Sequence, residues 1–79
     1  MPGKPPDPLD LLIGRNIRFY RLRRGLSQSA LARAIGVTYQ QVQKYERGLN
    51  RISAAQLYRA ATALGVPIPI LFEIKSVGC

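Results

Sequence analysis

The sequence contains no histidine, and its single cysteine, Cys79, is the last residue. One cysteine cannot form a disulfide within the chain, and the usual zinc sites require several histidines or cysteines at set spacings. The sequence therefore excludes an internal disulfide, and it predicts neither a bound metal nor a cofactor.

Acidic residues are scarce as well. The chain has four carboxylates, at Asp7, Asp10, Glu46 and Glu73. They are scattered along the sequence and no histidine accompanies them, so they offer neither a paired acid and base nor a base beside a nucleophile. We therefore expect a binding protein and not an enzyme.

Long hydrophobic runs are also absent. No stretch approaches the roughly 18 uninterrupted apolar residues of a membrane-spanning helix. The first residues, MPGKPPDP, lack the apolar core of a secretory signal. We expect a soluble, intracellular protein from these two absences.

Positive charge, by contrast, is in excess. Twelve Lys and Arg oppose four Asp and Glu, which gives a formal net charge of +8 over 79 residues. A chain this short buries only about 60% of its unfolded surface, which suffices for one core and no more. The composition therefore predicts a single domain with a polyanionic partner.

Prolines and glycines divide the chain. Residues 1–8 hold four of the six prolines and predict a flexible tail, followed by a domain over 9–74 and a second tail over 75–79. Within the domain, glycines at 25, 36, 48 and 65 follow segments with helical periodicity, as residues that end helices do. No strand-like alternation is present, so the fold class is all-α.

The expected helices begin at capping side chains and bury one apolar face each. They span residues 10–24, 28–35, 39–47 and 54–64, with a last turn over 67–73, and their caps are Asp10, Ser27, Thr38 and Ser53. The expected core consists of Ile13, Ile17, Tyr20, Leu31, Ala32, Ile35, Val42, Tyr45, Leu49, Leu57, Ala61, Leu64, Ile68, Leu71 and Phe72.

The second and third expected helices are separated by a very short turn. Small Ala32 allows the two helices to approach, Gly36 accepts a positive φ, and Val42 with Tyr45 closes the joint. Two short helices held at a steep angle by such a turn form a helix-turn-helix.

The stretch from Ile13 to Phe72 resembles the phage-repressor and Cro (XRE-like) type of helix-turn-helix DNA-binding domain. The similarity is carried by GLSQ-x-x-LA-x-x-x-GV from Gly25 to Val37 and by E-x-G ending at Gly48. It implies a compact five-helix, lambda-repressor-like fold that binds double-stranded operator DNA as a homodimer, in the cytoplasm with the nucleoid. The run TYQQVQKYERGLNRIS also resembles short alphaproteobacterial transcriptional regulators.

The outer face of helix 39–47 is entirely polar. At 100° per residue, one side carries Tyr39, Gln40, Gln43, Lys44 and Arg47. Glutamine matches adenine and lysine matches guanine in the major groove, while a tyrosine ring can meet a thymine methyl or a phosphate. We predict that Gln40, Gln43 and Lys44 read bases directly, with Tyr39 behind them.

Other residues are predicted to contact the DNA backbone, which positions a protein without reading sequence. The resemblance places Gln28 and Thr38 on phosphates at two helix N-termini. Arg47, Asn50 and Arg51 follow the reading helix and can contact the same strand.

Two further pairs concern the fold and assembly. The resemblance pairs Arg21 with Glu46 as an ion pair that joins the first and third helices. The family commonly has acidic or polar residues where this chain has Pro69 and Ile70. Ile70, beside Leu71, is therefore a candidate contact in a homodimer, a hypothesis that competes with simple extension of the core.

The preferred interpretation is a sequence-specific transcriptional regulator, by default a repressor, that binds an inverted repeat. One alternative is an antitoxin or protein-interaction module that also binds its own promoter. Another is a non-specific binder of nucleic acid, including RNA, but only six aromatic residues are present and the core is expected to take three of them. Binding to a membrane surface is disfavoured because the core needs the apolar stripe of the first helix. The sequence specifies neither the operator nor an effector.

Overall fold

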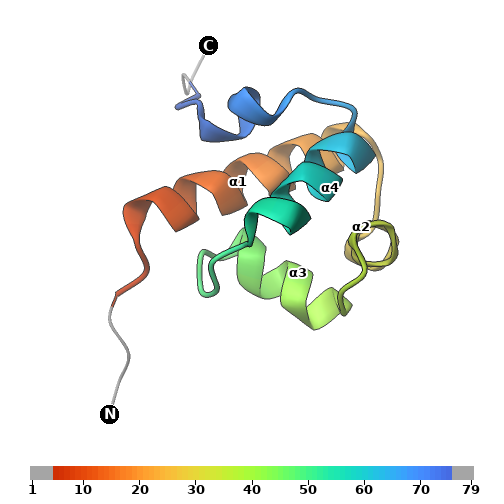
Figure 1. The fold of residues 1–79 in the computed structure, drawn as a ribbon, viewed down its shortest axis with the longest axis horizontal. Coiled ribbons are helices and arrows are strands. Elements are labelled where there is room, and N and C mark those ends of the chain that lie inside the picture. The colour runs from red at the N-terminus through yellow and green to blue at the C-terminus, as the bar shows by residue number, and fades with distance from the viewer. Residues whose placement is uncertain (1–4, 76–79) are drawn as a thin grey trace.

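The computed structural model describes residues 5–75, and the ends of both expected tails lie outside this range. The described chain forms four α-helices and one 3-10 turn, without a strand (Figure 1). In order these are α1(Pro8–Arg23), α2(Gln28–Ile35), α3(Tyr39–Glu46), α4(Ala54–Leu64) and η1(Ile68–Phe72). The predicted all-α fold is confirmed, with its fifth helix present as the 3-10 turn.

The first helix begins earlier than predicted. Asp7, and not Asp10, is the N-cap of α1, and its side chain accepts a hydrogen bond of 2.7 Å from the backbone N–H of Leu9. Pro8 is the first helical residue, since a proline there lacks only an N–H that would have no helical partner. Asp10 instead lies in the first turn, where its negative charge is favourable to the helix dipole.

The remaining helices follow the prediction closely because their ends are determined locally. Ser27, Thr38 and Ser53 cap α2, α3 and α4, each accepting a hydrogen bond from the backbone N–H three residues on. Gly36 and Gly65 end α2 and α4 with φ of 79° and 70°, a conformation that strains other residues. The third helix ends at Glu46, with Arg47 as its C-cap.

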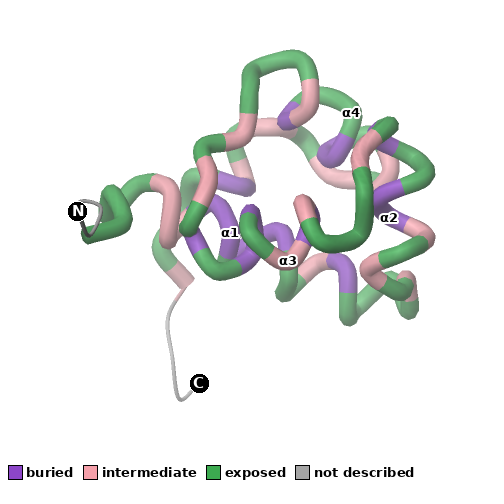
Figure 2. Tube along the Cα trace, turned by 90° about the horizontal axis from the view of Figure 1, so that it is seen from below, coloured by how far each residue is buried: buried purple, intermediate pink, exposed green. Residues whose placement is uncertain are grey.

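The core lies where the helices face one another (Figure 2). In Figure 1, α1 lies between η1 on one side and α3 on the other, and α2 packs against both α3 and α4. The buried apolar residues are Ile13, Ile17, Leu31, Ala32, Ile35, Val42, Tyr45, Leu57, Ala60, Ala61, Leu64 and Leu71. Most of the predicted core is therefore confirmed.

Two residues predicted to be buried are exposed, and two are only half-buried. Ile68 and Leu71 are three residues apart, which places them on one side of a 3-10 turn, so Phe72 points outward and is 40% exposed. Leu49 lies beyond the end of α3 and is also exposed. Tyr20 and Ile68 pack at the margin of the core.

Sequence reasoning missed Asn16, a fully buried polar residue on α1. Its side-chain Nδ2 donates hydrogen bonds of 2.8 Å to the backbone carbonyls of Leu71 and Glu73. These carbonyls belong to the end of η1 and the segment after it. Together with the 2.6 Å hydrogen bond from Lys75 Nζ to the Tyr20 hydroxyl, Asn16 holds the last described part of the chain against α1.

We expect Asn16→Ala to lower the free energy of unfolding by about 2–3 kcal/mol, because the buried Leu71 carbonyl and the partly buried Glu73 carbonyl lose their hydrogen-bond donor. Asn16→Asp should cost at least as much, since a carboxylate has the size of the amide but no N–H to donate. Urea unfolding followed by circular dichroism measures both effects. Stability within about 0.5 kcal/mol of wild type, the ordinary range for surface substitutions, would contradict this role.

Candidate nucleic-acid interface

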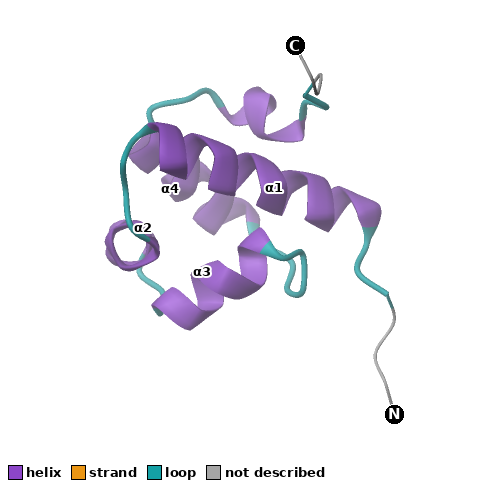
Figure 3. Ribbon diagram, turned by 180° about the vertical axis from the view of Figure 1, so that it is seen from behind, coloured by secondary structure: helices purple, strands orange, loops and turns teal. Residues whose placement is uncertain are grey.

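The helix-turn-helix joint is built as its sequence pattern predicts. Ala32, Val42 and Tyr45 are all buried between the helices. The backbone N–H groups of Gly36 and Val37 both donate to the carbonyl of Ala32, at 2.8 and 3.0 Å, which closes the turn after α2. Figure 3 shows α2 nearly end-on where α3 lies lengthwise, so the two axes cross steeply.

The described chain leaves the outer face of α3 uncovered. Tyr39, Gln40 and Lys44 are exposed, and Arg47 follows them at the C-cap. Gln43 is half-buried because it turns toward α2. The structure thus gathers the four predicted base readers on one surface, and none of their side chains is packed into the core.

Gln28 and Thr38 lie at the N-termini of α2 and α3, as predicted, but each is bonded within the protein. The Thr38 hydroxyl accepts a 3.2 Å hydrogen bond from the N–H of Gln41, and the residue stays exposed. Gln28 is half-buried and bonds to the side chains of Glu46 and Gln43. Its position is therefore determined by α3 as well as by its own helix.

Two other predicted phosphate contacts, Asn50 and Arg51, also have partners in the chain. Asn50 donates to the side chain of Gln41 at 3.3 Å. The Arg51 guanidinium lies 3.2 Å from a carboxylate oxygen of both Asp7 and Asp10. A hydrogen bond with Asp10, together with the charges of both carboxylates, raises the pKa of Arg51. Its positive charge is thus partly offset by two acids, although its side chain remains 72% exposed.

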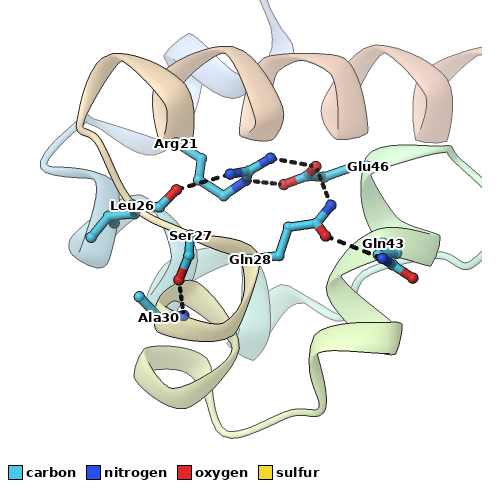
Figure 4. A network of polar contacts seen from close by, with 7 residues as sticks. All are labelled: Arg21, Leu26, Ser27, Gln28, Ala30, Gln43 and Glu46. Carbon is cyan, nitrogen blue, oxygen red and sulfur yellow. Dashed lines mark hydrogen bonds and ion pairs between the residues drawn. The ribbon is translucent and has the colours of Figure 1, made fainter.

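The buried ion pair implied by the resemblance is present (Figure 4). Arg21 Nε lies 2.6 Å from Glu46 Oε2, and Arg21 Nη2 lies 3.2 Å from Oε1. The side chains are only 8% and 3% exposed. A third guanidinium donor, Nη1, bonds to the carbonyl of Leu26 at 2.8 Å, so the pair joins α1, α3 and the loop before α2.

The suggested dimer contact changes in part. Leu71 is fully buried within the chain, while Ile70 is half-buried against the core. Only Ile70 therefore retains surface for contact with a second copy.

Neither a metal site nor a membrane helix appears in the described part of the chain. Residues 5–75 contain no group of three or more His, Cys, Asp or Glu placed to hold a metal ion. Over the same range, every helix is too short or too polar to span a bilayer.

Two features of this surface were missed by sequence reasoning. The side chains of Gln28 and Gln43 are hydrogen-bonded to each other across the joint, and Arg51 is paired with acids more than 40 residues earlier. No spacing or motif signals either contact, because both depend on how separate elements pack.

The sequence matches a known protein family and several curated relatives over most of its length. Residues 17–71 match the model of a helix-turn-helix family, HTH_3. An uncharacterized HTH-type transcriptional regulator of Sinorhizobium medicae (strain WSM419) is 43% identical over 70 residues, which cover 89% of this chain and 50% of the relative. The chain spans about half the length of the curated relatives it matches.

Two solved structures of regulatory proteins share this fold. The restriction-modification controller protein C.AhdI from Aeromonas hydrophila has a TM-score of 0.76 and 33% identity, over 80% of this chain and 96% of that one. The biofilm master regulator SinR, solved in complex with DNA, has a TM-score of 0.71 and 32% identity, over 77% of this chain and 98% of that one.

Proposed function

The chain belongs to the HTH_3 family of helix-turn-helix proteins, and from this premise we propose that it is a sequence-specific, DNA-binding transcriptional regulator. The observation that carries the proposal is the uncovered polar face of α3, braced from behind by buried Val42 and Tyr45. An α-helix of this kind fits the major groove, whose width is about 12 Å. The net charge of +8 favours a polyanion such as DNA.

We assign base contacts and backbone contacts from the position of each residue relative to α3. Tyr39, Gln40, Gln43 and Lys44 contact base edges, as side chains near the start of a recognition helix do. Backbone contacts come from both ends of that helix and from the start of α2; the residues are Gln28, Thr38, Arg47, Asn50 and Arg51. The helix N-termini add N–H groups suited to phosphate.

The assembly we propose is a homodimer that includes a contact at Ile70 and binds an inverted repeat. In that arrangement two copies of α3 reach half-sites about 34–36 Å apart, one turn of the duplex. A dimer bound over promoter DNA excludes polymerase, so repression is the default outcome. Such a protein acts in the cytoplasm, on the nucleoid.

The test separates base readers from backbone contacts. We expect Lys44→Ala to weaken binding to the preferred site by about 1–3 kcal/mol and to relax preference at one base pair. We expect Arg47→Ala to weaken all sequences alike and to reduce the slope of log affinity against log salt by about one. Titrations of specific and scrambled duplexes at several salt concentrations measure both quantities.

Arg15→Ala is the matched control, because it removes one exposed positive charge from α1 and so reports the effect of net charge alone. Identical profiles for Lys44→Ala and Arg47→Ala would remove the assignment of roles. Equal affinity of the wild type for specific and scrambled duplexes would remove sequence-specific regulation itself.

A further inference from the structure

A chain of hydrogen-bonded side chains runs from the buried ion pair to the outer face of α3 (Figure 4). Arg21 binds Glu46, Glu46 Oε1 accepts a 3.1 Å hydrogen bond from Gln28 Nε2, and Gln28 Oε1 accepts a 3.2 Å hydrogen bond from Gln43 Nε2. We call Arg21, Glu46, Gln28 and Gln43 the amide relay. Its last member is one of the proposed base readers.

The buried end of the relay has a fixed hydrogen-bond polarity. Arginine stays charged in proteins and only donates hydrogen bonds. Glu46, which is 3% exposed and held by two guanidinium nitrogens, is a carboxylate and therefore only accepts. Of the two ends of the Gln28 amide, only the amino group can face Glu46.

The same polarity passes to the surface end of the relay. With its amino group on Glu46, Gln28 presents its carbonyl oxygen to α3, so Gln43 must donate its own amino group to that oxygen. The Gln43 carbonyl oxygen is then the outward end of the side chain, and Figure 4 shows it pointing away from Gln28. Among residues 5–75, no side chain or backbone group donates to that oxygen.

Reversing the Gln43 amide would break this order. It would place two carbonyl oxygens against each other across the 3.2 Å contact with Gln28, and reversing Gln28 as well would bring its carbonyl onto the Glu46 carboxylate. An unpaired polar contact of this kind is costly where solvent cannot replace the lost partner. Gln40, which is exposed on the same face, has no comparable tether in the described chain.

We propose that the amide relay makes Gln43 a hydrogen-bond acceptor toward DNA, so that it selects a base bearing an exocyclic amine, adenine through N6 or cytosine through N4. Both amines lie in the major groove and donate hydrogen bonds. The inference rests on the proposed function and deepens it, because it states which chemical group one reader recognises. Gln28 is then a positioning residue for specificity as well as a backbone contact.

The test first locates the base pair that Gln43 reads. Selection from a random duplex pool is run with the wild type and with Gln43→Ala, and the base pair sought is the one whose preference disappears in the variant. Synthetic duplexes then lack one group at that pair. Purine for adenine, or 2-pyrimidinone for cytosine, removes the amine; 5-methyl-2-pyrimidinone for thymine, or 2-aminopurine for guanine, removes the opposing carbonyl.

We expect amine removal to weaken wild-type binding about tenfold more than it weakens binding by Gln43→Ala, the loss of one good hydrogen bond. Carbonyl removal should affect the two proteins equally. The Gln43→Ala comparison cancels the effect of each base analogue on the duplex itself. A larger wild-type penalty for carbonyl removal would show that Gln43 presents its amino group and would overturn the proposal.

Gln28→Met tests whether the relay sets the orientation, since methionine keeps the length of the side chain but donates and accepts almost nothing. Freed from Gln28, the Gln43 amide can rotate, so the extra penalty for amine removal should fall to about twofold while the penalty for carbonyl removal rises. Gln56→Met is the control: it makes the same exchange on α4, at a residue outside the proposed DNA contacts, and should leave both penalties at this base pair unchanged. Thermal unfolding of each variant shows that it folds.

Failure of this inference differs from failure of the proposed function. If the pool yields no preferred sequence for the wild type, the regulator proposal fails and the inference fails with it. If a preferred sequence is recovered but Gln43→Ala changes no position, Gln43 is not a base reader and the amide relay is refuted, while the regulator proposal stands. If Gln28→Met changes neither penalty, the amide relay alone is refuted. A uniform loss of affinity in Gln28→Met, with preference intact, would leave Gln28 as a backbone contact alone.

Discussion

Arg21→Met is expected to lower the free energy of unfolding by about 3–5 kcal/mol, because it leaves the Glu46 carboxylate buried without its counter-charge. The carboxylate is 3% exposed and loses contacts of 2.6 and 3.2 Å to the guanidinium. The Leu26 carbonyl loses its donor in the same variant. A domain of 79 residues has a total stability of only about 4–12 kcal/mol. Urea unfolding at neutral pH should therefore show that Arg21→Met retains only a small free energy of unfolding.

The reciprocal change and the double variant show whether stranded charge is the cause. Glu46→Leu should lower the free energy of unfolding by a similar amount. The Arg21 side chain is only 8% exposed, and this variant leaves its charge without the acid that pairs with it. Arg21→Met with Glu46→Leu should cost clearly less than the sum, because no buried charge remains and apolar replacements of a buried pair are often neutral. Strict additivity of the two single effects would contradict this account.

The surface ion pair of Arg51 provides the contrast. Its guanidinium has two carboxylates within 3.2 Å yet remains 72% exposed, so solvent screens the attraction. Arg51→Ala should leave the unfolding midpoint close to that of the wild type. Equal destabilisation by Arg51→Ala and Arg21→Met would show that burial does not explain the contribution of the Arg21–Glu46 pair to the free energy of unfolding.

Helix boundaries were predictable where short-range chemistry sets them. Ser27 and Thr38 cap their helices through a backbone N–H three residues away, and Gly36 ends α2 through its own φ. Each of these interactions lies within one turn of the residue that causes it. The apolar periodicity of α2 and α4 was equally informative, because each helix buries one face.

Sequence-based predictions were less accurate where two residues can play the same local role or where two local geometries fit the same spacing. Asp7 and Asp10 can each cap a helix, and the choice depends on Pro8 being tolerated in the first turn. The outward turn of Phe72 follows from a 3-10 geometry that apolar spacing does not distinguish from an α-helix.

The candidate site shows the same division. Helical periodicity alone predicts which residues share the outer face of α3, and Tyr39, Gln40 and Lys44 are exposed there in the structure. The bond between Gln28 and Gln43 could not be predicted, because it depends on the crossing of α2 and α3 and on a carboxylate supplied from the end of α3. In our proposal, the buried Arg21–Glu46 pair therefore determines which end of the Gln43 amide faces outward. Helical periodicity does not predict this orientation.

The position of α3 relative to α1 depends on Gly14, although helix propensity alone favours another residue at this position. Gly14 lies in the middle of α1, where alanine is favoured by about 1 kcal/mol. A Cβ at this position would lie 2.0 Å from the backbone oxygen of Tyr45 and 3.0 Å from the carbonyl carbon of Glu46. These are backbone atoms of the last turn of α3, which cannot rotate aside as a side chain would. The two helices would have to separate.

We expect Gly14→Ala to lower the free energy of unfolding by about 3 kcal/mol, at the upper end of the cost of overpacking and opposite in sign to its helix propensity. Gly36→Ala is the control. A Cβ at Gly36 would have no atom within 4 Å, but the residue has a φ of 79°. The substitution should therefore cost only the backbone strain, about 1–2 kcal/mol. Urea unfolding of both variants compares steric with conformational cost. A Gly14→Ala variant more stable than the wild type would show that α1 and α3 tolerate separation. Because α3 carries the proposed base readers, the same displacement should weaken binding to the selected duplex under conditions in which the variant remains folded.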